Sequence, residues 1–190
     1  MQNIFLVTFC MTVLGTGCRD NKAAEDNTSS NELTQDKIEK KVPLRAELVA
    51  RLTRAGELEI SGDNQAEVNT YFDTTNFRFH GPDGFEADYA GLTNYFKSIR
   101  AAFDDRTIKR GIVVAEGNYI SCQTWIEGKF VREFTQSPAG KLQPNGQRVV
   151  FDLINIFRFD DQGRLIEEWV QTDYRSFLRQ LGAKESSTKK

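Results

Sequence analysis

The chain has 190 residues, of which 39% are hydrophobic and 11% aromatic, enough apolar material for one sizeable core but hardly for two. We therefore expect a single folded domain. Its 25 lysine and arginine residues nearly balance its 27 aspartate and glutamate residues. Without a basic field to attract a phosphate backbone, we expect no nucleic-acid partner.

The chain begins with an apolar run from Ile4 to Gly17, which is too short to cross a bilayer as a helix. Such a run is typical of a secretory leader, so residues 1–17 are predicted to be a signal peptide. The small residues before Cys18 resemble the lipobox of bacterial lipoproteins. That resemblance implies lipidation of Cys18 and export to the cell envelope, with the lipid as the only attachment to a periplasmic or outer membrane. Cleavage without lipidation and an uncleaved anchor remain alternatives.

Three further segments follow the leader. Residues 18–43 are polar and mixed in charge, and are predicted to be a flexible tether. Residues 44–183 are predicted to form the folded domain. The last residues, 184–190, are predicted to be a disordered tail.

The first half of the domain has helical patterns. Apolar residues at helical spacing predict a helix from Pro43 to about Glu59 and a short one ending near Phe72, which Asp63 or Asn64 would cap. After a short strand that ends at His80, a third helix is predicted from about residue 88 to residue 103. Its aromatic residues are expected to pack in the core.

The second half has strand patterns. Strands are predicted at residues 108–115, 119–127, 149–159 and 164–173, with a further one through 130–134, and a helical segment is predicted from Tyr174. Helices followed by a meandering antiparallel sheet indicate an α+β fold. Along residues 149–159 both faces are apolar, whereas a sheet with water on one side would alternate. Because helices cover only one face, we expect a second subunit on the other, and hence a homodimer.

The hairpin from Gly140 to Asp173 is the most informative motif. It contains a glycine before a Val/Phe strand, the run Ile-Phe-Arg-Phe ending at Phe159, and Gly163 followed by Arg-Leu and by Glu168 and Trp169. These pieces, with Phe77 to Gly84 upstream, resemble the SnoaL-like polyketide cyclase family. The resemblance runs from about residue 46 to residue 182.

The resemblance implies the cone-shaped fold of nuclear transport factor 2 and ketosteroid isomerase, with N-terminal helices packed on a curved antiparallel sheet. It also implies a small apolar or polyketide-like ligand, chemistry without a cofactor, and homodimers, which are common in the family. The superfamily houses isomerases, dehydratases, hydrolases, cyclases and plain binding modules, so fold alone does not choose an activity.

Asp173 is the first candidate for an acid or base. On a strand, Trp169, Gln171 and Asp173 share one face, so an aromatic wall would lie next to the Asp173 carboxylate. Burial there would raise the pKa of Asp173. The resemblance implies the same role, since the aspartate at this motif position is the family's acid/base. The alternative is an aspartate that caps the helix starting near Tyr174.

His80, the only histidine, is the candidate polar partner of Asp173, because an imidazole can polarise a carbonyl or carry a proton. The family also places a histidine at the pocket mouth. The alternative is a histidine satisfied by the turn that follows. The candidates for the ligand-binding walls are Tyr71, Trp125, Asn155, Trp169 and Gln171. Asn155 lies among apolar neighbours and needs a partner such as a pocket carboxylate or a ligand hydroxyl.

Metal and covalent chemistry have weak sequence support. With one histidine and no cysteine cluster, no metal site is expected, and no cofactor is expected either. Cys122 lies in an apolar strand and is predicted to be a small buried hydrophobic residue. The leading hypothesis is therefore an exported domain that binds a small hydrophobic molecule and catalyses aldol cyclisation, isomerisation or dehydration. The alternative is a non-catalytic ligand-binding or interaction lipoprotein of the cell envelope.

Overall fold

The computed structural model describes residues 41–137 and 139–183. The predicted signal peptide, Cys18, most of the tether and the tail lie outside the described residues. Helix α2 spans Lys41–Ser61, α3 Gln65–Tyr71, α4 Tyr89–Ala102 and α5 Tyr174–Gln180. The strands are β1 Arg78–His80, β2 Glu86–Ala87, β3 Phe103–Glu116, β4 Tyr119–Phe130, β5 Arg148–Phe159 and β6 Leu165–Thr172, with a 3-10 turn, η1, at Pro82–Gly84. No helix in this part of the chain is both long and apolar enough to cross a membrane.

Local signals place the helix starts. Asn64 caps α3, because its side chain accepts a hydrogen bond from the Glu67 amide at 3.0 Å. Asp88 caps α4 in the same way through the Gly91 amide. The α+β prediction is confirmed, with a six-stranded sheet in the order β2-β1-β6-β5-β4-β3.

The expectation of a purely antiparallel sheet needs one correction. Strand β1 runs parallel to β6, while the other neighbouring strands are antiparallel. No hairpin joins β1 to β6, since α4 and four strands lie between them in the chain, so turn geometry does not impose an antiparallel direction. The strand expected at residues 130–134 is also absent: β4 ends at Phe130, and Phe134 forms only an isolated bridge to Leu142.

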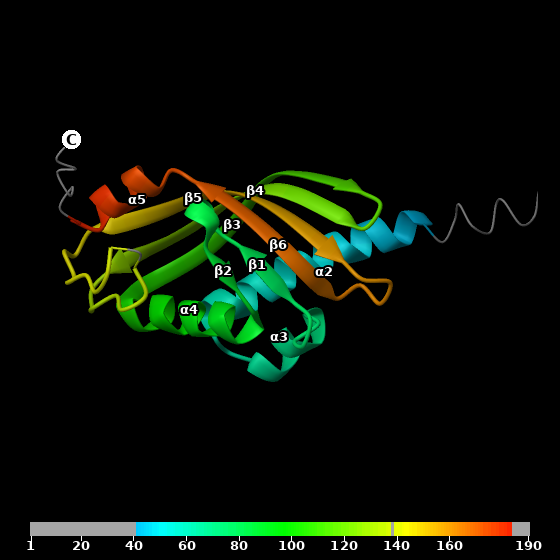
Figure 1. Ribbon diagram of the computed structural model, residues 1–190, viewed down its shortest axis with the longest axis horizontal. Helices are drawn as coiled ribbons and strands as arrows, with labels where there is room; N and C mark the ends of the chain where they lie inside the picture. Colours follow the sequence, from blue (N-terminus) through cyan, green and yellow to red (C-terminus); the bar gives the residue numbers. More distant parts are fainter. Residues whose placement is uncertain (1–40, 138, 184–190) are drawn as a thin grey trace, which may run out of the picture. The chain divides into compact units, whose positions relative to one another are not determined.

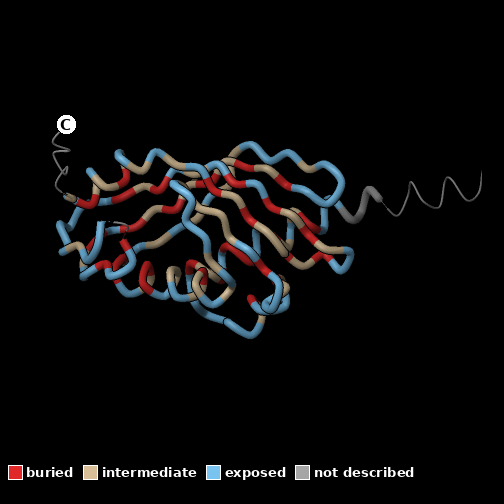
Figure 2. The backbone as a smooth tube through the Cα atoms, viewed as in Figure 1, coloured by how far each residue is buried: buried red, intermediate tan, exposed pale blue. Residues whose placement is uncertain are grey.

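The helices α2, α3 and α4 lie on one side of the curved sheet (Figure 1). Buried and exposed positions alternate along the strands, as Figure 2 shows, so each strand has an inner face toward the helices and an outer face away from them. On β5, Phe151 and Phe157 are buried against the helices, whereas Ile154 and Ile156 on the outer face are 50% and 43% exposed. Both faces of β5 are thus apolar in the structure. The outer face is exposed in a single chain.

Candidate ligand cavity

A cavity of about 700 Å³ lies between the helices and the inner face of the sheet. Its size suits a ligand of several rings or a comparable chain. Most of its walls are apolar. They include Leu52 and Ala55 from α2, Phe96 and Ile99 from α4, and Ile126, Phe151, Leu153, Phe157 and Val170 from the sheet. Phe79, Phe85 and the η1 turn also line it.

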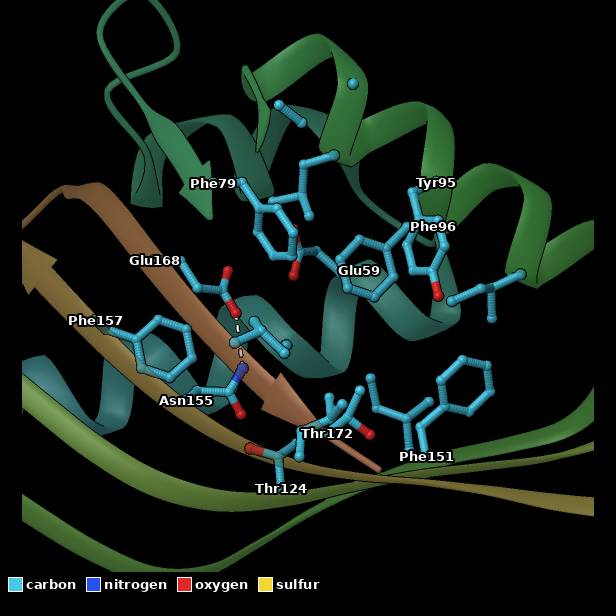
Figure 3. A pocket seen from close by; sticks show the side chains of 18 of the residues that line it. Glu59, Phe79, Tyr95, Phe96, Thr124, Phe151, Asn155, Phe157, Glu168 and Thr172 are labelled. Carbon is cyan, nitrogen blue, oxygen red and sulfur yellow. Dashed lines mark hydrogen bonds between the residues drawn. The ribbon is translucent and has the colours of Figure 1, made fainter. Parts of the chain in front are cut away.

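Glu168 is the central polar group of the cavity. It points from β6 into this space and is buried, and Asn155 of β5 donates a hydrogen bond from Nδ2 to its Oε1 at 2.8 Å (Figure 3). Burial raises the pKa of Glu168 to about 7, although the Asn155 hydrogen bond and the positive charge of Arg110 act against that shift. A carboxyl group that titrates near neutral pH can both accept and donate a proton.

Asn155, a predicted wall residue, is thus buried in the cavity beside a pocket carboxylate. Its Oδ1 atom has no hydrogen-bond partner among the described residues. An unpaired buried acceptor is costly, and the cost is removed when a ligand supplies a donor.

Glu59 is a second carboxyl group in the same space, reaching it from α2 (Figure 3). Glu59 is half-buried, and burial raises its pKa well above the ordinary value, with a further contribution from the negative charge of Glu168. Arg110 and Arg100 oppose the shift but do not cancel it. Both carboxyl groups therefore have a pKa above that of an exposed glutamate, and that of Glu168 is about 7.

Three tyrosines border the cavity: Tyr71, Tyr95 and Tyr174. Tyr71, a predicted wall residue, lines it with its ring, while its hydroxyl donates to Glu67 at 3.1 Å. Tyr95 of α4 also lines it, and burial raises the pKa of this phenol so strongly that it stays neutral.

Asp173, the first sequence candidate, lies elsewhere. It is exposed, it does not line the cavity, and its Oδ1 accepts from the Ser176 amide at 3.0 Å as the cap of α5. The geometry therefore matches the capping alternative and gives no support to an acid/base role inside the cavity.

His80, Trp169 and Gln171 lie on the outer side of the sheet. The His80 ring stacks on Trp169 with centroids 5.2 Å apart, and its nitrogens are each 2.8 Å from a carboxylate oxygen, of Glu86 and of Glu167. Gln171 is exposed on the same face as Ile154, its partner on β5. His80 and Asp173 therefore do not converge on the cavity, and neither Trp169 nor Gln171 forms its wall.

Trp125 is also outside the cavity, on the outer face of β4. A Cβ atom at Gly111 would lie 2.7 Å from its ring, so the indole packs across this glycine where β3 bulges.

A bulge explains why the sequence reading chose the wrong face of β6. Simple alternation from Leu165 places Trp169 and Gln171 with the buried leucine. The β5–β6 register shifts next to Phe159, however, so the buried positions of β6 are Leu165, Glu168 and Val170. Sequence reasoning used Glu168 only as a family motif residue and missed Glu59 and Arg110 entirely. The sequence did contain one indication of this site: a buried Asn155 needs a hydrogen-bond partner, which the neighbouring strand can supply.

Within the described part of the chain, no three His, Cys, Asp or Glu side chains lie close enough to hold a metal ion. Cys122 is buried there and carries a free thiol.

Comparisons with known proteins agree with this architecture. AclR of Streptomyces galilaeus, assigned as a hydroxylase, matches with a TM-score of 0.61 at 22% identity, covering 73% of this chain and 97% of its own. IdmH of Streptomyces antibioticus, assigned as a polyketide cyclase, matches with a TM-score of 0.58 at 23% identity, over 73% and 99% of the two chains. A ketosteroid isomerase-like protein of Catenulispora acidiphila, solved with trimethylamine, matches with a TM-score of 0.51 at 11% identity, over 70% and 92%. At these identities the likeness shows the fold. A search of the curated proteins found no match.

The helices on a curved sheet, with a cavity between them, define the class: an α+β protein with the fold of nuclear transport factor 2 and ketosteroid isomerase. The model of the SnoaL-like polyketide cyclase family matches residues 58–181, more than half of the chain. The chain belongs to that family, and the resemblance seen in the hairpin is confirmed.

Proposed function

We propose that the cavity binds a small, largely apolar molecule and that Glu168 moves a proton to or from it without a cofactor. The observation that carries this proposal is a buried carboxyl group in an apolar cavity with a pKa of about 7. Near physiological pH such a group is available in both protonation states, which is the condition for efficient general acid or base catalysis.

The two carboxyl groups divide the roles. Ionised Glu168 is the base, oriented by Asn155, while Glu59 keeps its proton and acts as hydrogen-bond donor or acid. Pairs of acids whose surroundings separate their pKa values commonly carry such complementary roles.

Removal of a proton from the carbon beside a carbonyl is the reaction step that best fits the cavity. Aldol cyclisation, isomerisation and dehydration all contain this step, and it requires a desolvated base more than any covalent nucleophile. Family membership and the assignment of IdmH as a polyketide cyclase support the same reaction class.

A non-catalytic ligand carrier of the cell envelope is the second candidate. The leader-like residues 1–17 and the lipobox-like stretch before Cys18 favour it, because polyketide cyclases normally act in the cytoplasm beside their synthases. Lipid-anchored export is itself a proposal that rests on these residues. Replacement Cys18→Ser should release the protein from membranes or block leader removal, and unchanged fractionation would refute lipidation.

Exchange of the α-hydrogens of 2-tetralone in D₂O, followed by proton NMR, tests the catalytic proposal with a simple apolar ketone. The protein should accelerate exchange, with a rate that rises with pH and levels off above about pH 7 as Glu168 ionises. Replacement Glu168→Gln should lower the rate by about 10²-fold or more.

Asp173→Asn is the matched control, because asparagine caps a helix about as well as aspartate and Asp173 lies outside the cavity. It should leave exchange unchanged. If Asp173→Asn abolished exchange and Glu168→Gln did not, the proposed base would be wrong. Tight binding of 2-tetralone without any exchange would favour the carrier.

A further inference from the structure

Arg110 of β3 is a charged group that the proposed proton transfer has not used. It lines the cavity from the inner face of the sheet. Its Nη1 donates to Thr124 Oγ1 at 2.5 Å and lies 3.7 Å from Cys122 Sγ, and its guanidinium carbon is 5.4 Å from the centre of the Phe157 ring. The guanidinium is thus fixed by a hydroxyl, a thiol and an aromatic face.

The charge of Arg110 has no direct counter-ion. Within the described residues, six other arginines form ion pairs with carboxylates. No acidic side chain there comes within ion-pair distance of Arg110, although its charge lowers the pKa of both Glu59 and Glu168. A positive group that borders an apolar cavity without an ion pair is placed to meet a negative charge on a ligand.

Gly56 shows that the helix makes room for this side chain. A Cβ atom at this position would lie 2.9 Å from Arg110 Nη2 and 3.1 Å from Ile108 Cδ1. Glycine inside a helix costs about 1 kcal/mol relative to alanine. The glycine inside α2 therefore leaves room for Arg110 Nη2 to lie against the helix.

We propose that Arg110 is the oxyanion-binding residue of this cavity and that the ligand presents a carbonyl oxygen to its guanidinium while the neighbouring carbon faces Glu168. This inference rests on the proposed function and names its substrate class: an apolar ketone or a related carbonyl compound with a hydrogen on the adjacent carbon.

The electron flow is balanced within the two molecules. The Glu168 carboxylate takes the proton, the electrons of the C–H bond form a carbon–carbon double bond, and the carbonyl π electrons move to oxygen. Arg110 stabilises the resulting enolate oxygen by charge and by N–H donation. Return of the proton from Glu168 to a different carbon of a conjugated enolate completes an isomerisation. In an aldol closure the enolate carbon attacks a second carbonyl, and the resulting alkoxide takes the proton back from Glu168.

Binding of 2-naphthol tests Arg110 separately from catalysis, because its anion has the shape and charge of an aromatic enolate but cannot react further. Ultraviolet absorption distinguishes bound naphtholate from bound naphthol. The wild-type protein should bind the anion at a pH where free 2-naphthol is neutral. Replacement Arg110→Gln should lower the ionised fraction of bound probe by about 10²-fold, the usual effect of losing one oxyanion donor.

Four other variants separate the explanations. Glu168→Gln should keep or increase the naphtholate signal, because it removes a neighbouring negative charge. Arg110→Lys should retain part of the signal, and Gly56→Ala should weaken it by displacing the guanidinium without removing its charge. Arg179→Gln, at an exposed arginine outside the cavity, should change nothing. If Arg110→Gln failed to fold, Arg110→Lys and Gly56→Ala would carry the comparison.

Two results would overturn the inference: wild-type protein that binds 2-naphthol only in its neutral form or not at all, or a naphtholate signal that survives Arg110→Gln. An Arg110-dependent naphtholate signal in a protein that does not exchange the hydrogens of 2-tetralone would reject the proposed catalysis alone. It would leave Arg110 as the anion-binding group of a carrier.

Discussion

The burial of Glu168 affects both the stability of the fold and the proposed chemistry. Most of the cavity wall is apolar, and the single hydrogen bond that Glu168 receives from the described residues comes from Asn155. Placing an acid there is unfavourable once it ionises, because the charged form loses more hydration than one amide restores. Such a residue is expected where function requires a carboxyl group that holds its proton until neutral pH.

This cost has a definite pH dependence. The pKa of Glu168 is about 7 in the folded state, above its unfolded value. Below the unfolded pKa the carboxyl group is neutral and its burial does not lower the stability of the fold. Stability is lost as the pH rises through the folded value. The loss is on the order of 3 kcal/mol above that range. Replacement Glu168→Gln keeps an acceptor for Asn155 and should raise the melting temperature near pH 8 while changing it little near pH 4.

Thermal unfolding at both pH values, with the exposed Glu47→Gln as the control, measures this difference. Equal effects of Glu168→Gln at the two pH values would mean that Glu168 is not held neutral by burial.

At the level of helices and strands, His80 links the short strand β1 to both neighbouring strands, β2 and β6. Glu86 lies on β2 and Glu167 on β6, and Arg158 of β5 also binds Glu167. Burial alone would lower the pKa of His80, but the hydrogen bonds to the two carboxylates raise it more, so that it lies above the ordinary value. When it is protonated, the imidazole is paired with both carboxylates and holds the β1–β2 segment, whose residues Phe79 and Phe85 line the cavity.

Amide hydrogen exchange across residues 78–87 should report this attachment. Since the pKa of His80 is raised on folding, its contribution to stability is complete below about pH 6.5, the unfolded value, and is lost as pH rises through the folded value. After correction for intrinsic rates, protection of this segment should fall over that range. Replacement His80→Gln should remove the pH dependence, and a wild-type segment whose protection stays constant would contradict the role of the ion pairs.

At the scale of the whole molecule, the outer face of the sheet still lacks an explanation. Ile154 and Ile156 are exposed there, and so is Val114 of β3, whose partner Ser121 lies opposite Ile156. We propose that a second copy of the chain covers this face, as the apolar pattern of residues 149–159 predicts.

Ile154→Glu should therefore yield monomers, raising the dimer dissociation constant by about 10²-fold or more, because an unpaired charge would be buried in the interface. Sedimentation at micromolar concentration measures this. Tyr119→Glu, on the same face but near the β3–β4 turn, offers a comparison at the edge of the patch. A wild-type protein that sediments as a monomer would sink the dimer proposal.

Local signals in the amino-acid sequence are enough to predict most helices and strands of this protein. Turn glycines, capping residues such as Asn64 and Asp88, and periodic apolar residues specify elements through local interactions, and the hairpin at residues 140–173 pointed to the family. Which groups share the cavity depends on long-range packing. Glu59, Arg110 and Glu168 lie on α2, β3 and β6, and their meeting depends on how α2 packs over the sheet and on one bulge that reverses the facing of β6. A one-residue shift of register moves every side chain to the other face, and no local pattern in β6 reveals it.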